Sequence, residues 1–119
     1  MRPDERDAAY LWDMAEAARE VHAMVDQTPV DEFLADRILL RATERCIEII
    51  GESARRISTD LQARHPEIPW RNIIGQRNIL AHEYGQIDHE LLYRTAIEDI
   101  PTLIQQLEEM LPPLDGAPD

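Results

Sequence analysis

Four side chains that can bind or cleave a phosphodiester lie within eight residues of one another: Arg77, Asn78, His82 and Tyr84. An arginine holds a phosphate through two parallel hydrogen bonds, and a histidine, with an ordinary pKa of about 6.5, transfers protons near neutral pH. Asn78 lies one helical turn before His82 and can orient it. Tyr84 lies nearly two turns after Arg77, on the same edge of a helix. The stretch therefore predicts proton transfer at a bound phosphate.

Each of these side chains also has a purely structural explanation. Arg77 can be a surface ion-pair partner, for example of Glu83, and His82 can be an ordinary histidine at a helix end. Tyr84 can be an ordinary amphipathic anchor at a helix end. The residues by themselves leave both interpretations open, although a purely structural helix does not require these polar groups.

The geometry of an ideal helix separates Arg77 from His82. Five residues at about 100° each leave the two side chains about 140° apart around the axis. Two arrangements bring them to one target: the helix ends near His82 and frees its ring, or two copies pair around a two-fold axis so that both pairs line one cleft. Either arrangement places the site at the end of this helix.

The apolar spacing predicts helices throughout the chain. A first helix is expected over residues 4–26 and is broken by Thr28-Pro29, and a second is expected over residues 31–57. The second has a buried stripe of Leu34, Ile38, Ala42, Cys46, Ile49, Ile50, Ala54 and Ile57. Gly51 in its middle costs about 1 kcal/mol relative to alanine, which indicates close helix packing there.

Capping residues and prolines predict the remaining elements. Ser58 begins a short helical turn that stops before Pro66, and Pro69 is expected to be the first residue of a helix that ends at Tyr84 with Gly85 as its cap. Asp88 begins the last helix, which Pro101 is expected to kink near its middle. We therefore expect an all-α, four- to five-helix antiparallel bundle, with one domain over residues 1–112 and a flexible tail over residues 113–119.

A second polar set follows one face of the long helix, at steps of three and four residues: Arg37, Arg41, Arg45, Glu48, Glu52 and Arg55. Alternating charges at this spacing usually form ion pairs on a solvated face, each contributing a few tenths of a kcal/mol. The same stripe also suits a cleft between two copies. In that case Arg41 or Arg45 contacts the phosphate-bearing ligand, and Glu48 or Glu52 orients Arg77.

Composition excludes several classes of protein. The 119 residues are 44% hydrophobic and 30% charged, which is too apolar for a disordered chain, and no run is long enough to span a membrane. Cys46 is the only cysteine, so an intrachain disulfide and a Cys-rich zinc site are excluded, and we expect it to pack in the core. The histidines lack metal-ligand spacing. We therefore expect a cytoplasmic protein without a leader, metal or cofactor.

The net charge of −12 argues against nucleic-acid binding in general, but it is unevenly distributed. Residues 1–36 contribute −7 and residues 78–119 contribute −8, whereas residues 37–77 contribute +3. All twelve basic residues are arginine. The central third is therefore the segment best suited to a phosphate backbone.

The pattern Arg77-x4-His82-x-Tyr84 resembles the motif of HEPN-domain ribonuclease toxins, in the HepT-like branch that is paired with a small nucleotidyltransferase antitoxin. Residues 41–54 are similar to that family's second helix, and residues 68–71 and 74–78 are similar to the run into its motif. Residues 98–101 resemble its last helix, including the proline. The resemblance covers about residues 8–112, so the motif is more specific than R-x4-H alone.

The resemblance implies an all-α homodimer whose two motifs face a shared cleft, and a metal-independent endoribonuclease. Arg77 and His82 would be catalytic, with Asn78, Glu48 and Glu52 supporting them. RNA would contact Arg41, Arg45 and Arg71. A MntA-like nucleotidyltransferase antitoxin would silence the toxin by adding AMP to Tyr84, as in a type VII toxin–antitoxin pair.

Two other functions remain open on the sequence. The chain can be a non-catalytic helical dimer that binds or regulates a nucleotidyltransferase, which its acidity favours because negative charge repels RNA at long range. It can also be a purely structural dimerisation bundle, which leaves the Arg-Asn-x3-His-x-Tyr run unexplained.

Overall fold

The structure, a computed structural model, describes residues 4–82 and 87–111. Its first helix, α1 (Glu5–Val25), begins where the side chain of Asp4 accepts a hydrogen bond of 2.8 Å from the backbone N–H of Asp7. The helix ends at Asp26, and the following Gln27 has a φ of 61°, which turns the chain back. The prediction of a helix over residues 4–26 is confirmed.

The expected long second helix is wrong, because the chain forms two helices there. α2 (Val30–Ala35) and α3 (Arg37–Arg56) are separated by Asp36, whose backbone is extended at φ −101° and ψ 97°. The side chain of Asp36 accepts a hydrogen bond from the N–H of Leu39 and so begins α3 anew. This break changes the helical phase, and Ile38, which was expected in the buried stripe, is 83% exposed.

α4 and α5 follow the expected capping residues. Ser58 caps α4 (Thr59–Arg64) by accepting from the N–H of Leu61. α5 (Trp70–His82) begins directly after Pro69, whose carbonyl accepts from the N–H of Ile73. The end expected at Tyr84 and the cap expected at Gly85 lie outside the described residues. Trp70 is buried, and its indole N–H donates a hydrogen bond of 3.0 Å to the carbonyl of His65, so its side chain anchors the start of α5 by packing.

The last helical segment, residues 89–110, contains a π-helical turn. Asp88 caps α6 (His89–Arg94), as expected, by accepting from the N–H of Leu91, and the π turn Thr95–Asp99 leads into α7 (Ile100–Met110). Pro101 has no N–H to give to the carbonyl four residues before it. The irregularity expected at this proline thus takes the form of a wide turn, in which the N–H of Ile100 reaches back to the carbonyl of Thr95.

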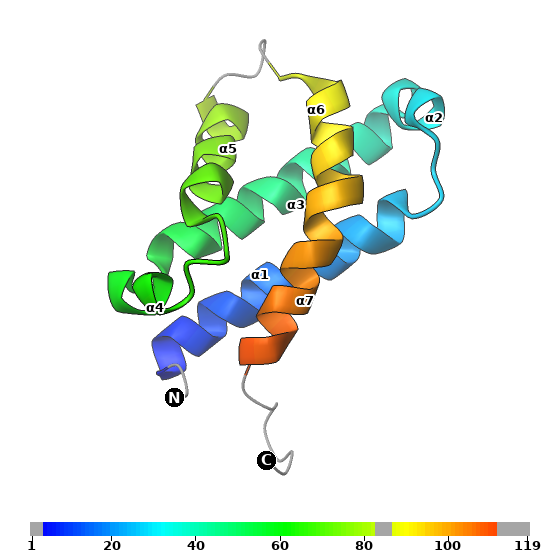
Figure 1. The fold of residues 1–119 in the computed structure, drawn as a ribbon. Coiled ribbons are helices and arrows are strands. Elements are labelled where there is room, and N and C mark those ends of the chain that lie inside the picture. Colours follow the sequence, from blue (N-terminus) through cyan, green and yellow to red (C-terminus); the bar gives the residue numbers. More distant parts are fainter. Residues whose placement is uncertain (1–3, 83–86, 112–119) are drawn as a thin grey trace.

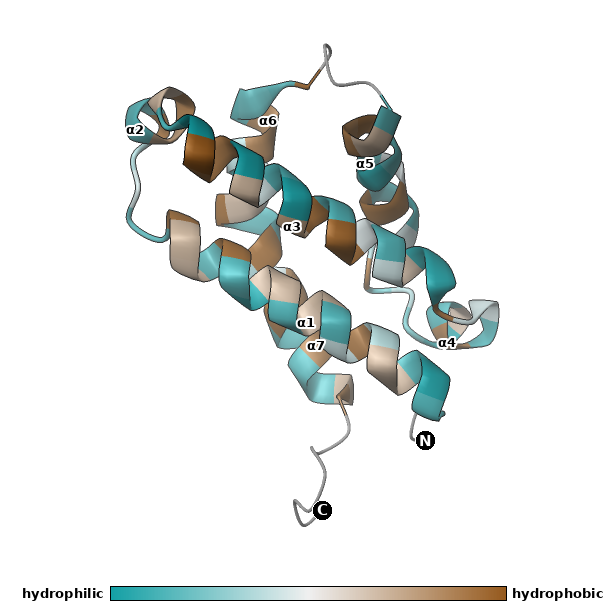
Figure 2. Ribbon diagram, turned by 180° about the vertical axis from the view of Figure 1, so that it is seen from behind, coloured by the Kyte–Doolittle hydropathy of each residue, from teal (hydrophilic) through white to brown (hydrophobic). Residues whose placement is uncertain are grey.

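Four long rods make up the bundle: α1, α3, α5, and α6 with the π turn and α7 (Figure 1). α1 and α3 run antiparallel, α5 packs across one half of α3, and the last rod lies against α1 (Figures 1 and 2). Phe33 of α2 is fully buried against the ring of Tyr93, with centroids 5.2 Å apart. The all-α bundle expected from the sequence is confirmed. No helix in the described ranges combines the length and the apolarity that a membrane crossing requires.

Candidate active site where α3 meets α5

The close contact between α3 and α5 depends on Gly51. A Cβ atom at Gly51 would overlap the Cβ of Arg77 and lie 2.9 Å from the carbonyl oxygen of Ile73. The missing side chain therefore allows the backbone of α5 to lie directly on α3, and the close packing predicted at Gly51 is confirmed. This contact brings Arg77 beside the residue that follows Gly51, which is Glu52.

Arg77 and Glu52 form an ion pair between the two helices. The Nη2 of Arg77 lies 3.0 Å from the Oε2 of Glu52, and the arginine side chain is only 20% exposed. The other carboxylate oxygen of Glu52 accepts from Arg55 at 2.9 Å and from Arg56 at 3.0 Å. The hydrogen bond from Arg55, with that from Arg56 and the charges of Arg55 and Arg77, lowers the pKa of Glu52. Glu52 therefore stays ionised and holds the guanidinium of Arg77 from one side.

Part of the hydrogen-bonding capacity of this pair is unused. Arg77 donates through Nη1 to the side-chain oxygen of Asn78 at 3.0 Å. The Nε of Arg77 and the Oε2 of Glu52 are buried and have no hydrogen-bond partner in the described part of the chain. The ion pair is thus close in distance without an aligned hydrogen bond. Glu52 and Asn78 therefore hold the guanidinium of Arg77 in place, and a guanidinium that is fixed in this way is suited to receive an anion.

A depression of about 220 Å³ opens beside this ion pair. Arg45 and Glu48 line it together with Glu52 and Arg77, so side chains of the polar stripe on α3 and of the motif on α5 share one surface. Arg45 pairs with Glu48 at 3.4 Å, and Arg41 pairs with Glu44 at 3.1 Å. The ion pairs expected along this face are confirmed, and Glu52, rather than Glu48, is the carboxylate that contacts Arg77.

His82 does not join this arrangement within one chain. It is the last residue of α5, is exposed, and does not line the depression. The oxygen of Asn78, which was expected to orient His82, accepts from Arg77 instead. Tyr84 lies outside the described residues. Arg71 is exposed near the start of α5 and lines a different shallow depression.

Comparison with known proteins gives a consistent result. The family model "Ribonuclease HepT-like" matches residues 14–110. The chain is 38% identical over 101 residues to "Probable ribonuclease HepT" of Thermococcus cleftensis, which covers 85% of this chain and 92% of that one. It is 36% identical over 100 residues to "Putative RNase MJ1380" of Methanocaldococcus jannaschii, with 84% and 92% covered. No solved structure gives a significant match.

The chain belongs to the HepT-like ribonuclease family. The resemblance drawn from the motif and its flanking segments is thereby confirmed, and so is the expectation that the chain belongs to a family of ribonucleases. The match of this HepT-like chain begins at residue 14, within α1, and ends at the last residue of α7.

One contributor to the site of this HepT-like chain was missed in the sequence. Arg56 donates to Glu52 from one turn further along α3, and the i, i+4 spacing of the two residues was the available indication. No group of three or more His, Cys, Asp or Glu side chains that is able to hold a metal ion occurs in residues 4–82 and 87–111.

Proposed function

We propose that this HepT-like chain is the toxin of a type VII toxin–antitoxin pair and cleaves RNA without a metal ion. The observation that carries the proposal is the guanidinium of Arg77, which Glu52 holds at 3.0 Å and which lines a depression of about 220 Å³. Such a group binds a phosphodiester in a defined orientation and stabilises the charge that grows on it in the transition state.

RNA supplies its own nucleophile, the 2′-hydroxyl, so the protein needs only a base, an acid and a stabilising charge. His82 removes the proton of that hydroxyl or gives a proton to the leaving 5′-oxygen. The 2′-oxygen then forms a bond to phosphorus while the bond to the 5′-oxygen breaks. The products are one fragment with a 2′,3′-cyclic phosphate and one with a 5′-hydroxyl.

The proposal includes a homodimer, because within one chain His82 does not line the depression at Arg77. Pairing around a two-fold axis lets the histidine of one copy approach the arginine of either copy in a shared cleft. The exposed Ile38 supports an interface on this side of α3, since it lies seven residues before Arg45 and so on the same helical face as the depression. Arg41, Arg45 and Arg71 are the proposed contacts for RNA.

Regulation by a partner completes the proposal. A MntA-like nucleotidyltransferase antitoxin in the same cytoplasm adds AMP to Tyr84. The added phosphodiester brings negative charge and the adenosine brings bulk close to the motif in sequence, and both oppose the binding of RNA.

A non-catalytic role is the second candidate. The net charge of −12 favours a helical dimer that binds or regulates a nucleotidyltransferase, since an acidic surface repels RNA at long range. This candidate predicts tight binding of the nucleotidyltransferase and no ribonuclease activity of the purified chain.

Cleavage of RNA in the presence of EDTA tests the proposal. Arg77→Ala and His82→Ala should each abolish cleavage while the helical circular dichroism is retained. Arg94→Ala and His22→Ala are matched controls, because both residues are exposed and neither lines the depression. If Arg77→Ala and His82→Ala cleave as fast as the parent, the mechanism is wrong. Growth of cells that express the parent or His82→Ala without the antitoxin then separates a toxin from an accessory subunit.

A further inference from the structure

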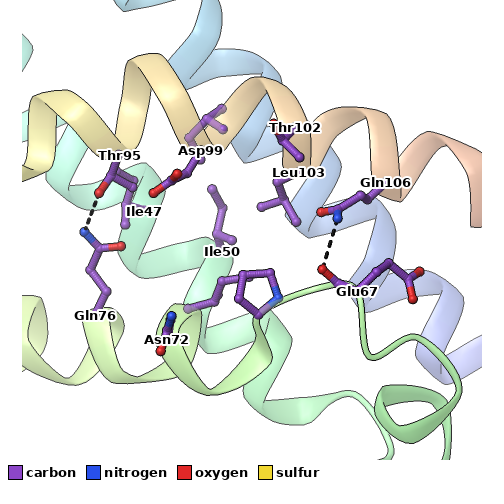
Figure 3. Close-up of a pocket in the computed structure, with 13 residues that line it drawn as sticks. Ile47, Ile50, Glu67, Asn72, Gln76, Thr95, Asp99, Thr102, Leu103 and Gln106 are labelled. Atoms are coloured by element: carbon purple, nitrogen blue, oxygen red, sulfur yellow. Dashed lines mark hydrogen bonds between the residues drawn. The ribbon is translucent and has the colours of Figure 1, made fainter.

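A second pocket, of about 370 Å³, lies between α5 and the last rod (Figure 3). None of its lining residues lines the depression at Arg77. Its floor and walls are aliphatic and come from three helices: Ile47, Ile50, Ile73, Ile100 and Leu103. This volume is at the lower end of the range of about 300–1,000 Å³ that small-molecule sites occupy.

One hydrogen bond joins the last rod to α5, and another joins it to the turn between α4 and α5, at the two ends of the pocket. At one end the side-chain nitrogen of Gln76 donates 3.3 Å to the hydroxyl of Thr95, and at the other that of Gln106 donates 3.1 Å to the carbonyl of Glu67 (Figure 3). Because these bonds hold the rod against α5 and against the turn that precedes α5, the pocket is open before a ligand binds.

The polar groups at the mouth have a definite chemistry. Asp99 extends from the rod and Asn72 from α5 toward the space between the two elements (Figure 3). Neither has a side-chain hydrogen bond to another residue of the described ranges, and no lysine or arginine lines the pocket. The mouth therefore offers a carboxylate acceptor and an amide that both donates and accepts, and it lacks the cation that a phosphate requires.

The π turn that precedes Pro101 also shapes this pocket. Thr95 and Asp99 are its first and last residues, and both line the pocket. π turns are rare, and within α-helices they occur frequently at functional sites, because the wider turn redirects side chains. Here the turn places a hydroxyl and a carboxylate above the aliphatic floor.

We propose that this pocket binds a nucleobase that carries an exocyclic amino group, such as cytosine or adenine. The flat ring lies on the isoleucines and Leu103, the amino group donates to Asp99, and Asn72 pairs with the ring edge. The phosphate of a nucleotide remains outside, away from the carboxylates. The base comes either from an unpaired position of RNA, in which case the inference rests on the proposed function and names a base preference, or from a free nucleoside.

The first arm of the test measures nucleoside binding to the full chain by calorimetry and by NMR. Cytidine and adenosine should bind at least about tenfold more tightly than uridine and inosine, which lack the amino group, because a hydrogen bond to a charged acceptor is lost. Asp99→Ala should remove this preference. Glu98→Ala, which changes the adjacent exposed carboxylate outside the pocket, should keep it. Circular dichroism checks that both variants fold.

The second arm measures which bases flank the cuts in single-stranded RNA. A loss of base preference in Asp99→Ala, with the cleavage rate otherwise retained, assigns the pocket to RNA, whereas nucleoside binding with unchanged cutting assigns it to a free nucleoside. Absence of binding together with unchanged cutting overturns the inference, as does equal binding of cytidine and uridine. The proposed function is judged separately, by the loss of cleavage in Arg77→Ala.

Discussion

Gly51 of α3 and Arg77 of α5 lie so close that a Cβ atom at Gly51 would overlap the Cβ of Arg77. The contact sets how closely α5 packs on α3. It also places the Cβ of Arg77 against Gly51, the residue directly before Glu52. A glycine in the middle of a helix, which is unfavourable for that helix alone, is therefore part of the geometry of the candidate site.

Gly51→Ala should destabilise the fold. The new Cβ meets the Cβ of Arg77 and the carbonyl oxygen of Ile73, neither of which can move without moving α5. We expect the free energy of unfolding to fall by about 1–3 kcal/mol, since overpacking outweighs the gain in helix propensity. Urea denaturation followed by circular dichroism measures this change.

Gly75→Ala is the matched control for that variant. Gly75 also lies inside a helix, but nothing lies within 4 Å of a Cβ placed there. This variant should be as stable as the parent or more stable by up to about 1 kcal/mol. Equal stability of Gly51→Ala and Gly75→Ala would contradict the close packing.

Glu52→Gln should slow RNA cleavage more than Glu48→Gln does. Glu52 contacts Arg77, whereas Glu48 pairs with Arg45 on the same wall of the depression. Glutamine keeps the shape of the side chain but removes the charge that holds the guanidinium, so we expect kcat to fall about tenfold, which corresponds to about 1.4 kcal/mol. Single-turnover cleavage at saturating RNA makes the comparison, and a larger effect of Glu48→Gln would refute the assignment.

Glu52 should also contribute to the dependence of stability on pH. Its pKa in the folded chain is lowered from the ordinary value of 4.5, first by the hydrogen bond from Arg55. A lowered folded pKa means that the contribution is complete above the unfolded pKa and is lost as the pH falls through the folded pKa. Between pH 6 and acid pH, Glu52→Gln should therefore lose less stability than the parent. Identical acid profiles of the two proteins would exclude this contribution.

Cys46 should react slowly in the folded protein. Burial, together with the nearby carboxylate of Glu20, raises the pKa of its thiol to about 11 from 9.0, and its side chain is only 7% exposed. The raised pKa alone leaves about 100-fold less thiolate near pH 8, and the thiolate is the reactive form. Alkylation by iodoacetamide, followed by mass spectrometry, should be slow in buffer and fast in denaturant. Equal rates under the two conditions would show that the thiol is accessible.

Local features of the chain determined most of the helices. Asp4, Ser58 and Asp88 begin helices because each accepts a hydrogen bond from an N–H three residues ahead, an interaction that needs no other part of the protein. The motif residues could also be recognised locally, because the motif is defined by the spacing of Arg77, His82 and Tyr84 along the chain. Even the close packing at Gly51 was predicted, because a mid-helix glycine has a local cost that only a contact offsets.

Tertiary structure decided the features that depend on contacts between distant segments. The periodicity of residues 31–57 is compatible with one helix. A helix break capped by Asp36 competes with that single helix at nearly equal local energy. The packing of α2 and α3 therefore selects the break, which leaves Ile38 exposed. Likewise, both Glu48 and Glu52 lie on the correct face of α3. The position along α3 at which α5 crosses it determines which carboxylate contacts Arg77. That position follows from the packing of side chains far apart in sequence.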